Sequence, residues 1–273
     1  MMTRLPRLIA DLPAFQTVAV RSVRHWNEHL FSFAVERPAS FRFRSGEFVM
    51  IGLPGSGEPP ARPVMRAYSI ASPAWSDELE FLSIKVADGP LTARLQTIRA
   101  GDQLYLGRKP TGTLVADALL GGRRLFLFST GTGLAPFLSI ARDPEIYVRF
   151  EQVVVVHSVR RVGDLAFHRE QTALWADDPL VGDEAVYRFH YVPTVTREPF
   201  HTTGRIGALL ESGALFPLGL EGPRRLDPAT DRAMLCGSTA MIRDTAAMLE
   251  AAGFAEGSNA TPGSYVIERA FVD

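Results

Sequence analysis

The pattern of apolar residues changes near Gly121-Gly122, and this change constrains the fold more than any other feature of the sequence. After it, strongly apolar stretches alternate with segments of helical period. The stretch 152–159 contains four successive valines, which is typical of a strand covered on both faces. Alternating strands and helices predict a doubly wound parallel sheet, with helices on both faces, over residues 121–273.

The chain before this change has a different rhythm. Short stretches that alternate apolar and polar residues follow one another closely from residue 15, with one short helix expected at 89–98, where Pro90 suits a first turn. Many short strands with a single helix predict an antiparallel β-barrel over residues 15–120. Residues 1–14 are expected to be an N-terminal extension.

The individual elements follow from the same patterns. In the first part, strands are expected at 15–23, 30–38, 66–72 and 79–86. The stretch 41–53 alternates, is expected to turn at Ser45-Gly46, and then continues as an apolar strand. In the second part, strands are expected at 123–130, 152–159, 187–196, 231–238 and 264–273, and helices at 133–143, 165–178, 206–213 and 240–253.

Composition excludes several classes of protein. A formal net charge of −1 gives no reason to expect a nucleic acid or an anionic membrane as partner, and no stretch is apolar for long enough to span a membrane. The single cysteine, Cys236, cannot form an internal disulfide, a Cys-rich zinc site or an iron–sulfur cluster. It fits a reducing compartment such as the cytoplasm. No metal site is expected: His25 and His29 are four residues apart, but the segment between them resembles a strand.

A glycine-rich stretch follows the first strongly apolar strand. The apolar run stops at Thr130-Gly131-Thr132-Gly133, and a segment of helical character comes next. In a doubly wound sheet this is the carboxyl end of a strand, where ligands bind, and glycines let a phosphate or sugar approach the backbone. An ordinary strand–helix turn has the same composition, so the stretch alone leaves both interpretations open.

The next three strands also end in residues suited to a nucleotide. Arg160 and Arg161 follow one strand and Arg197 follows the next, so their guanidinium groups can converge on one phosphate. Arginine at this edge favours the 2′-phosphate of NADP, although a solvated surface arginine is the alternative for each, and Arg161 can point away. Cys236-Gly237 ends the following strand and would admit a flat ring, but a lone cysteine is commonly a buried, inert thiol.

The first part of the chain holds weaker candidates. Tyr68 lies in a strand beside Arg66 and Ser69, and an aromatic residue in a strand belongs to a core more often than to a cofactor platform. Gly89 and Thr92 lie at a helix start, which is a second candidate seat for a phosphate.

Six segments, taken together and in this order, resemble ferredoxin–NADP reductase, in particular the bacterial type. They are RAYSIASP at 66–73, IKVADGPLT at 84–92, STGTGLAPF at 129–137, TREPFH at 196–201, CGS at 236–238 and VIERAFVD at 266–273. The resemblance covers residues 15–273. It implies a barrel that binds FAD noncovalently and a nucleotide domain that binds NADP(H).

The resemblance also implies the residues of the site. Those expected at the FAD are Arg66, Ala67, Tyr68, Ser69, Ile84, Lys85, Val86, Gly89, Leu91, Thr92, Ala270 and Phe271. Those expected at NADP(H) are Thr130, Gly131, Thr132, Gly133, Arg160, Arg161, Arg197, Cys236 and Gly237. Those expected near the reacting atoms are Ser69, Cys236, Glu268 and Ala270.

The tail departs from the plant-type pattern, which ends on a tyrosine over the flavin. Ala270 takes that place and three residues follow it, so no aromatic gate is expected. We expect Phe271 to lie against the FAD adenine; the alternative is that it packs on the barrel.

The implied activity is hydride transfer from NADPH to the flavin, followed by transfer of single electrons to ferredoxin or flavodoxin. Residues 1–117 carry 14 Lys or Arg and 11 Asp or Glu, a net charge of +3, so we expect transient, electrostatic docking of an acidic carrier on a monomer. Alternatives are an oxygenase reductase component, a free flavin reductase, or a nucleotide sensor without turnover. The single cysteine excludes a fused iron–sulfur domain.

Overall fold

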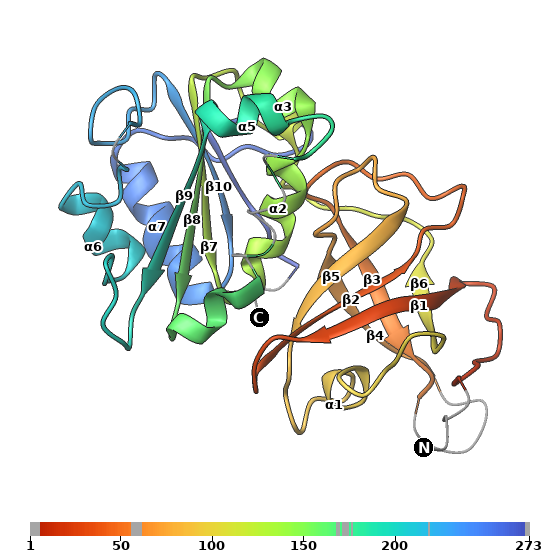
Figure 1. Ribbon diagram of the computed structural model, residues 1–273. Coiled ribbons are helices and arrows are strands. Elements are labelled where there is room, and N and C mark those ends of the chain that lie inside the picture. The colour runs from red at the N-terminus through yellow and green to blue at the C-terminus, as the bar shows by residue number, and fades with distance from the viewer. Residues whose placement is uncertain are drawn as a thin grey trace.

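The computed structural model describes residues 6–55, 62–167, 170, 175, 177–217 and 219–270. Two domains lie side by side (Figure 1). The first is built on a six-stranded antiparallel sheet and the second on a five-stranded sheet whose neighbouring strands are parallel. The predicted fold class, an antiparallel barrel followed by a doubly wound parallel sheet, is confirmed.

The barrel strands are β1 (Phe15–His25), β2 (Leu30–Glu36), β3 (Phe48–Leu53), β4 (Val64–Ser69), β5 (Glu78–Ile84) and β6 (Gln103–Gly107). Their order is β4-β3-β6-β1-β2-β5, so β4 and β5 are the edges that meet when the sheet curls. A hydrogen bond of 2.8 Å from Ala71 N to Glu80 O joins the chain beyond β4 to β5. The short helix α1 (Thr92–Leu95) buries Leu95 in the barrel core.

The parallel strands are β7 (Arg124–Thr130), β8 (Gln152–Val159), β9 (Phe189–Val195), β10 (Asp231–Cys236) and β11 (Tyr265–Ile267), in the order β11-β10-β7-β8-β9. Between β7 and β10 the strand order reverses, and this reversal is where doubly wound sheets bind ligands. The valines of β8 explain the burial of both faces. Val153 and Val155 pack into the core on one face, and Val154 and Val156 into the core on the other.

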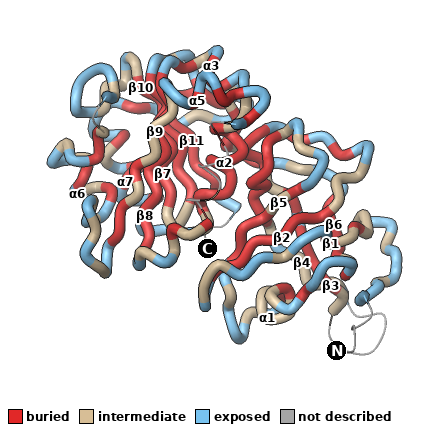
Figure 2. The backbone as a smooth tube through the Cα atoms, viewed as in Figure 1, coloured by how far each residue is buried: buried red, intermediate tan, exposed pale blue. Residues whose placement is uncertain are grey.

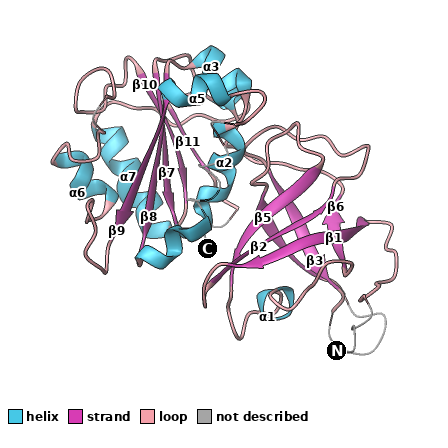
Figure 3. Ribbon diagram, in the orientation of Figure 1, coloured by secondary structure: helices cyan, strands magenta, loops and turns pink. Residues whose placement is uncertain are grey.

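Helices cover both faces of this sheet (Figure 3). On the face toward the barrel lie α2 (Ala135–Ala141) and α3 (Pro144–Arg149), with α5 (Gly182–Arg188) nearby. On the other face lie α6 (Ile206–Glu211) and α7 (Thr239–Ala251). Three 3-10 segments complete the described elements: η1 (Ala116–Ala118), η2 (Gly131–Leu134) and η3 (Val162–Leu165).

The two domains share an apolar interface. Leu30, Ala71 and Leu82 of the barrel belong to the same buried cluster as residues of α2 and the parallel sheet, and the buried backbone is continuous between the domains in Figure 2. Polar contacts add to this packing: Asn259 Nδ2 donates to Gly112 O at 3.0 Å, and Asn27 Nδ2 donates to Gly163 O at 3.1 Å. The domains therefore present one fixed seam.

Three predicted strands were partly wrong. Residues 41–44 are not a strand: Phe41 and Phe43 are buried and the arginines between and after them are exposed, so the alternation marks an irregular segment. The last strand ends at Ile267, because the chain then leaves the sheet to contact the barrel. The segment between His25 and His29 is a turn between β1 and β2 rather than strand-like.

Other predicted elements differ at their ends or cannot be compared. The helical turns after β7 begin at Gly131, two residues before the predicted start. Helix α5 extends through Arg188, where a strand was predicted from 187. The helix predicted at 165–178 lies largely outside the described residues. No helix within the described ranges is long and apolar enough to cross a membrane, and those residues hold no cluster of metal-ligating side chains.

Candidate active site

The loops that follow β7 and β10 pack directly against each other at the reversal of strand order. A Cβ added to Gly133 would lie 2.3 Å from the carbonyl oxygen of Cys236, so no side chain fits there. Ser238 N donates to Thr130 Oγ1 at 2.7 Å and ties the two loops together. The glycine at 133 is thus required by a close approach of two strand ends.

Gly131 begins the turn with a φ of +54°, in the left-handed region that favours glycine. A Cβ added there would meet no atom within 4 Å, so the space beside it is open. The carbonyl oxygen of Gly131 lies 3.0 Å from Nε2 of His157, below the loop in β8. An open backbone surface at the carboxyl ends of the strands suits a nucleotide, and the role expected of Thr130 to Gly133 stays a prediction.

The structure brings Arg160 and Arg197 together. Arg197 N donates to Arg160 O at 3.1 Å, which extends the β8–β9 ladder by one pair beyond the strand ends. Both residues are exposed, and within the described part of the chain neither guanidinium has an acidic partner. Arg161 is also exposed at the same corner. Two exposed arginines on neighbouring strand ends, with no ion pair to a described residue, suit a phosphate.

Sequence analysis missed Arg205, which lies at the same edge. The bond from Thr194 Oγ1 to Gly204 O, 2.7 Å long, and the bridge between Val195 and Thr203 return the chain to the carboxyl end of β9. Arg205 follows directly, is exposed, and begins helix α6. It does not follow a strand in sequence, so the strand-end pattern could not find it.

The barrel seam holds the residues predicted for the flavin. Arg66 on β4 is exposed, and among the described residues its guanidinium donates to the carbonyl of its neighbour Met65, at 2.8 Å. On the other edge strand, at and beyond the end of β5, Ile84 and Val86 are 48% and 41% exposed. A cation and exposed apolar side chains on the two edges of the barrel fit a ligand that has a flat apolar ring and a phosphate.

Tyr68 is more buried than an aromatic ring whose face is free to stack on a flavin. Its ring is 8% exposed and packs edge-on against Phe33 and Phe81, and its hydroxyl lies 3.1 Å from Ser83 Oγ. Burial raises the pKa of this hydroxyl. Ser69, the last residue of β4, is buried and pairs with Phe48. The stacking role predicted for Tyr68 stays a prediction.

The residues predicted for the flavin phosphates form a tight turn. Thr92 Oγ1 donates to Val86 O at 3.3 Å, and a Cβ added to Gly89 would lie 2.1 Å from Thr92 Oγ1. Leu91 is buried in the barrel core, so it can offer only its backbone. The Lys85 amino group donates to Asn27 O at 2.6 Å and its backbone N donates to His29 O at 2.7 Å, so both donors are engaged within the barrel.

Glu268 brings the two domains together at the predicted catalytic residues. Its carboxylate is buried and accepts from Thr113 N at 3.4 Å and from Ala270 N at 2.9 Å. Burial raises the pKa of this carboxyl. The same carboxylate approaches Gly112, whose Cβ would lie 3.1 Å from Glu268 Oε2 and 3.5 Å from the ring of Phe48, the partner of Ser69.

Cys236 is close enough to Glu268 for the carboxylate to affect it. Burial raises the pKa of the Cys236 thiol strongly, and the charge of Glu268 adds to the rise. The thiol is therefore protonated and is not a nucleophile at neutral pH. Ala270 is exposed beside this group, and Phe271 lies outside the described residues.

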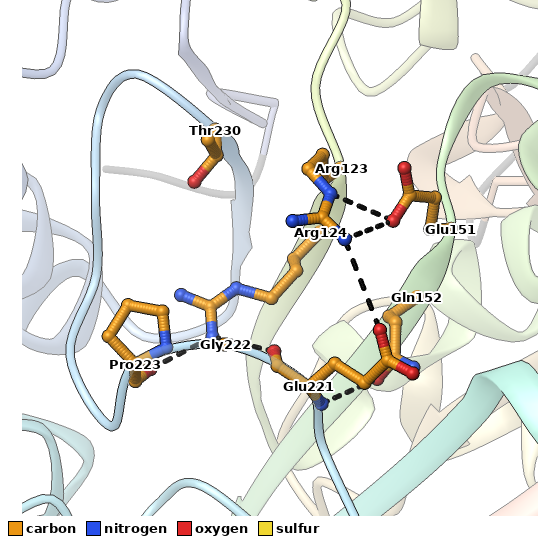
Figure 4. A pocket seen from close by; sticks show the side chains of 8 residues that line it. All are labelled: Arg123, Arg124, Glu151, Gln152, Glu221, Gly222, Pro223 and Thr230. Atoms are coloured by element: carbon orange, nitrogen blue, oxygen red, sulfur yellow. Dashed lines mark hydrogen bonds and ion pairs between the residues drawn. The ribbon is translucent and has the colours of Figure 1, made fainter.

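A pocket at the other end of the parallel strands does not belong to this site (Figure 4). Its lining residues are Arg123, Arg124, Glu151, Gln152, Glu221, Gly222, Pro223 and Thr230. Arg124, Gln152 and Asp231 begin β7, β8 and β10, so the pocket lies at the amino ends of the strands. Its central guanidinium is already occupied by protein partners, which makes it a structural feature.

Comparisons with known proteins agree with this geometry. The family model described as oxidoreductase FAD-binding domain matches residues 16–115, and the one described as oxidoreductase NAD-binding domain matches residues 127–247. The fold and the site thus define a two-domain flavin- and nicotinamide-nucleotide-dependent oxidoreductase.

The relatives narrow this class. The chain is 52% identical to a flavodoxin/ferredoxin–NADP reductase of Rhodobacter capsulatus, over 96% of this chain and 94% of the relative. It is 51% identical to a ferredoxin–NADP reductase of Pseudomonas aeruginosa, over 94% and 98%. A crystal structure of a ferredoxin NADP+ reductase from Neisseria gonorrhoeae, with bound FAD and NADP, superposes with a TM-score of 0.80 at 32% identity, covering 94% of this chain and 99% of that one. The chain belongs to the ferredoxin/flavodoxin–NADP reductase family, as predicted.

Proposed function

We propose that this chain moves electrons between NADPH and a one-electron carrier, ferredoxin or flavodoxin, with FAD as its noncovalent cofactor. The observation that carries the proposal is the seam between the domains. There Glu268 and the end of β10 meet the strand pair that holds Ser69, so a flavin in the barrel and a nicotinamide on the sheet would face each other. We assign the boundary between the two domains to residues 120–121.

Each part of the site has a separate task. Arg160, Arg197 and Arg205 bind the 2′-phosphate, and the turn at Gly131 to Gly133 admits the pyrophosphate. Arg66 binds a phosphate of FAD, while Ile84 and Val86 cover the ring edge. FAD, when bound, supplies hydride chemistry and single-electron chemistry in one group. The buried carboxyl of Glu268 lies at the seam, where burial raises its pKa, and the methyl group of Ala270 leaves the ring face without an aromatic cover.

The carrier docks transiently on the barrel side through exposed arginines. Arg42 and Arg62 are exposed, and within the described chain Arg42 donates to the backbone carbonyls of Ala39 and Phe41. Arg44 contributes less, because it pairs with Glu47 at 3.0 Å and with Asp117 at 3.7 Å. Exposed charges of one sign speed the encounter with an acidic protein more than they tighten the complex. The enzyme acts as a monomer in the cytoplasm.

The test is anaerobic reduction of the purified protein. NADPH should bleach a yellow protein, and heat should release FAD; the reduced protein should then pass electrons to a ferredoxin or a flavodoxin. Release of FMN would overturn the cofactor assignment. Turnover only with free flavin would indicate a flavin reductase, and a colourless protein that binds nucleotide without reduction would indicate a sensor.

A further inference from the structure

A buried histidine lies directly beneath the glycine turn. His157 is the sixth residue of β8, is 2% exposed, and lies on the sheet face toward α2. Its two ring nitrogens contact different elements. Nε2 lies 3.0 Å from the carbonyl oxygen of Gly131, and Nδ1 lies 2.7 Å from the hydroxyl of Tyr191 on β9. Three strand segments are thus joined by one short chain of hydrogen bonds.

The chemistry of these groups fixes the direction of each bond. A carbonyl oxygen only accepts, so Nε2 of His157 carries a hydrogen and donates to Gly131. Burial lowers the pKa of His157 to about 4, so the ring is neutral at physiological pH and has only one N–H. Nδ1 is then an acceptor, and the Tyr191 hydroxyl donates to it.

We propose that His157 and Tyr191 are positioning residues for the dinucleotide loop. Tyr191 holds the imidazole as the Nε2–H tautomer, and that N–H turns the Gly131 carbonyl inward, away from the pyrophosphate. A carbonyl oxygen left free to face outward would present partial negative charge to an anion at close range. The assignment rests on the proposed function, because it is NADP(H) that the loop receives.

The chain around Gly131 explains why such an anchor is needed. Gly131 has a φ of +54° and open space where a side chain would be, so neither sterics nor a packed Cβ holds its peptide plane. Ser129, two residues earlier, bonds Val156 O at 2.9 Å and is fixed within the sheet. Gly131 is also the first residue of the 3-10 segment η2, so His157 adds a side-chain contact to the carbonyl that begins this segment.

Two amide substitutions of His157 distinguish the effect of its Nε2 hydrogen-bond donor from the effect of the size of its ring. His157→Gln keeps a donor near the Nε2 position, and His157→Asn keeps a polar group only near Nδ1. We expect His157→Asn to weaken NADP+ binding about tenfold, the effect of one lost hydrogen bond of ~1.4 kcal/mol. His157→Gln should weaken it by less than about threefold, and Tyr191→Phe by about threefold, since each keeps part of the chain of bonds.

The probe 2′-AMP shows whether the effect is local. It has the 2′-phosphate but no pyrophosphate, so its binding should be the same in all variants. The matched control is His190→Asn, a histidine of β9 that contacts Gln152 at the other end of the sheet. It should leave both NADP+ and 2′-AMP binding unchanged. Unfolding of each variant, measured in parallel, reports any general loss of structure.

The tautomer of His157 is measured in the absence of NADP(H). Long-range 1H–15N spectra of the FAD-loaded protein should show His157 as neutral Nε2–H. A Nδ1–H tautomer, or NADP+ binding by His157→Asn equal to the wild type, overturns the assignment. Equal loss of 2′-AMP and NADP+ affinity also overturns it, because the effect would then be general. If the wild type itself neither binds NADP+ nor is reduced by NADPH, the proposed function fails and the assignment falls with it.

Discussion

Arginines lie at both ends of the parallel sheet, and their surroundings are opposite. At the amino ends, Arg124 is buried and its guanidinium donates to Asp231 at 2.6 and 2.7 Å and to the carbonyl of Arg225. It also donates to the carbonyls of Glu221 and Pro223 (Figure 4). At the carboxyl ends, Arg160 and Arg197 are exposed and have no acidic partner in the described chain. An arginine whose donors are satisfied by protein holds the fold, whereas one without partners is available to a ligand.

The largest expected effect comes from breaking the buried pair. Arg124→Ala leaves Asp231 buried without its cation, and such a loss costs about 3–5 kcal/mol of unfolding free energy. Urea unfolding should report this loss, while the preference of the surviving folded protein for NADPH over NADH stays unchanged. Arg123→Ala is the matched control. Arg123 is exposed and its ion pair with Glu151 lies at the surface, so stability should barely change.

Glu80, on β5, sharpens the comparison between charged groups with and without protein partners. Little in its surroundings compensates its carboxylate for the loss of solvent. Desolvation raises its pKa to about 7, and no hydrogen bond reaches its carboxylate from the described residues. The folded state then binds more protons than the unfolded state between about pH 4.5 and 7, so stability falls as pH rises through this window. Glu80→Gln should remove that slope and be more stable at pH 8 by ~1–2 kcal/mol. Equal pH slopes in both proteins would contradict this.

Arg205 tests whether the arginines that bind the 2′-phosphate include one beyond Arg160 and Arg197, which follow β8 and β9. Arg205→Ala removes one charge-assisted contact to the 2′-phosphate and should raise the KM for NADPH about tenfold. The KM for NADH, which lacks that phosphate, should stay within about twofold, and flavin content should not change. A parallel rise in both KM values would show that the variant disturbs α6 rather than a phosphate contact.

The smallest effect concerns the barrel. Replacing Arg42 and Arg62 with alanine should slow carrier-dependent turnover by roughly threefold at low salt. The difference from the wild type should vanish at high salt, because exposed charges are screened over about 8–10 Å at physiological ionic strength. NADPH-dependent bleaching, which does not involve the carrier, is the internal control. Carrier-dependent turnover that does not change with salt concentration would argue against electrostatic docking.

Most of the fold could be predicted from local patterns. The valine run of β8 predicted a strand covered on both faces, and the strand–helix alternation predicted the parallel sheet. The alternation at Phe41 and Phe43 misled because burial alternates there without strand pairing. The early end of β11 could not be predicted, because it depends on Thr113, which bonds Ile267 from another domain 154 residues away.

Sequence analysis proposed site residues where they follow strands and overlooked candidates that do not. Arg160 and Arg197 were proposed because parallel strands bring their carboxyl ends to one edge. Arg205 follows a loop, and His157 looks like any polar residue at the end of an apolar strand. The structural role of Arg124 depends on Asp231, 107 residues away, so the residues near Arg124 in the sequence could not predict this role.

The central claim is that the unpaired arginines at the carboxyl ends read the 2′-phosphate. The most direct measurement is the ratio of kcat/KM for NADPH to that for NADH in Arg160→Ala/Arg197→Ala and in the wild type. Each contact contributes about 1.5–3 kcal/mol, so the ratio should fall by about a hundredfold or more, with FAD retained and urea unfolding unchanged within ~0.5 kcal/mol. An unchanged ratio in a folded, flavin-loaded double variant would mean that the 2′-phosphate is read elsewhere.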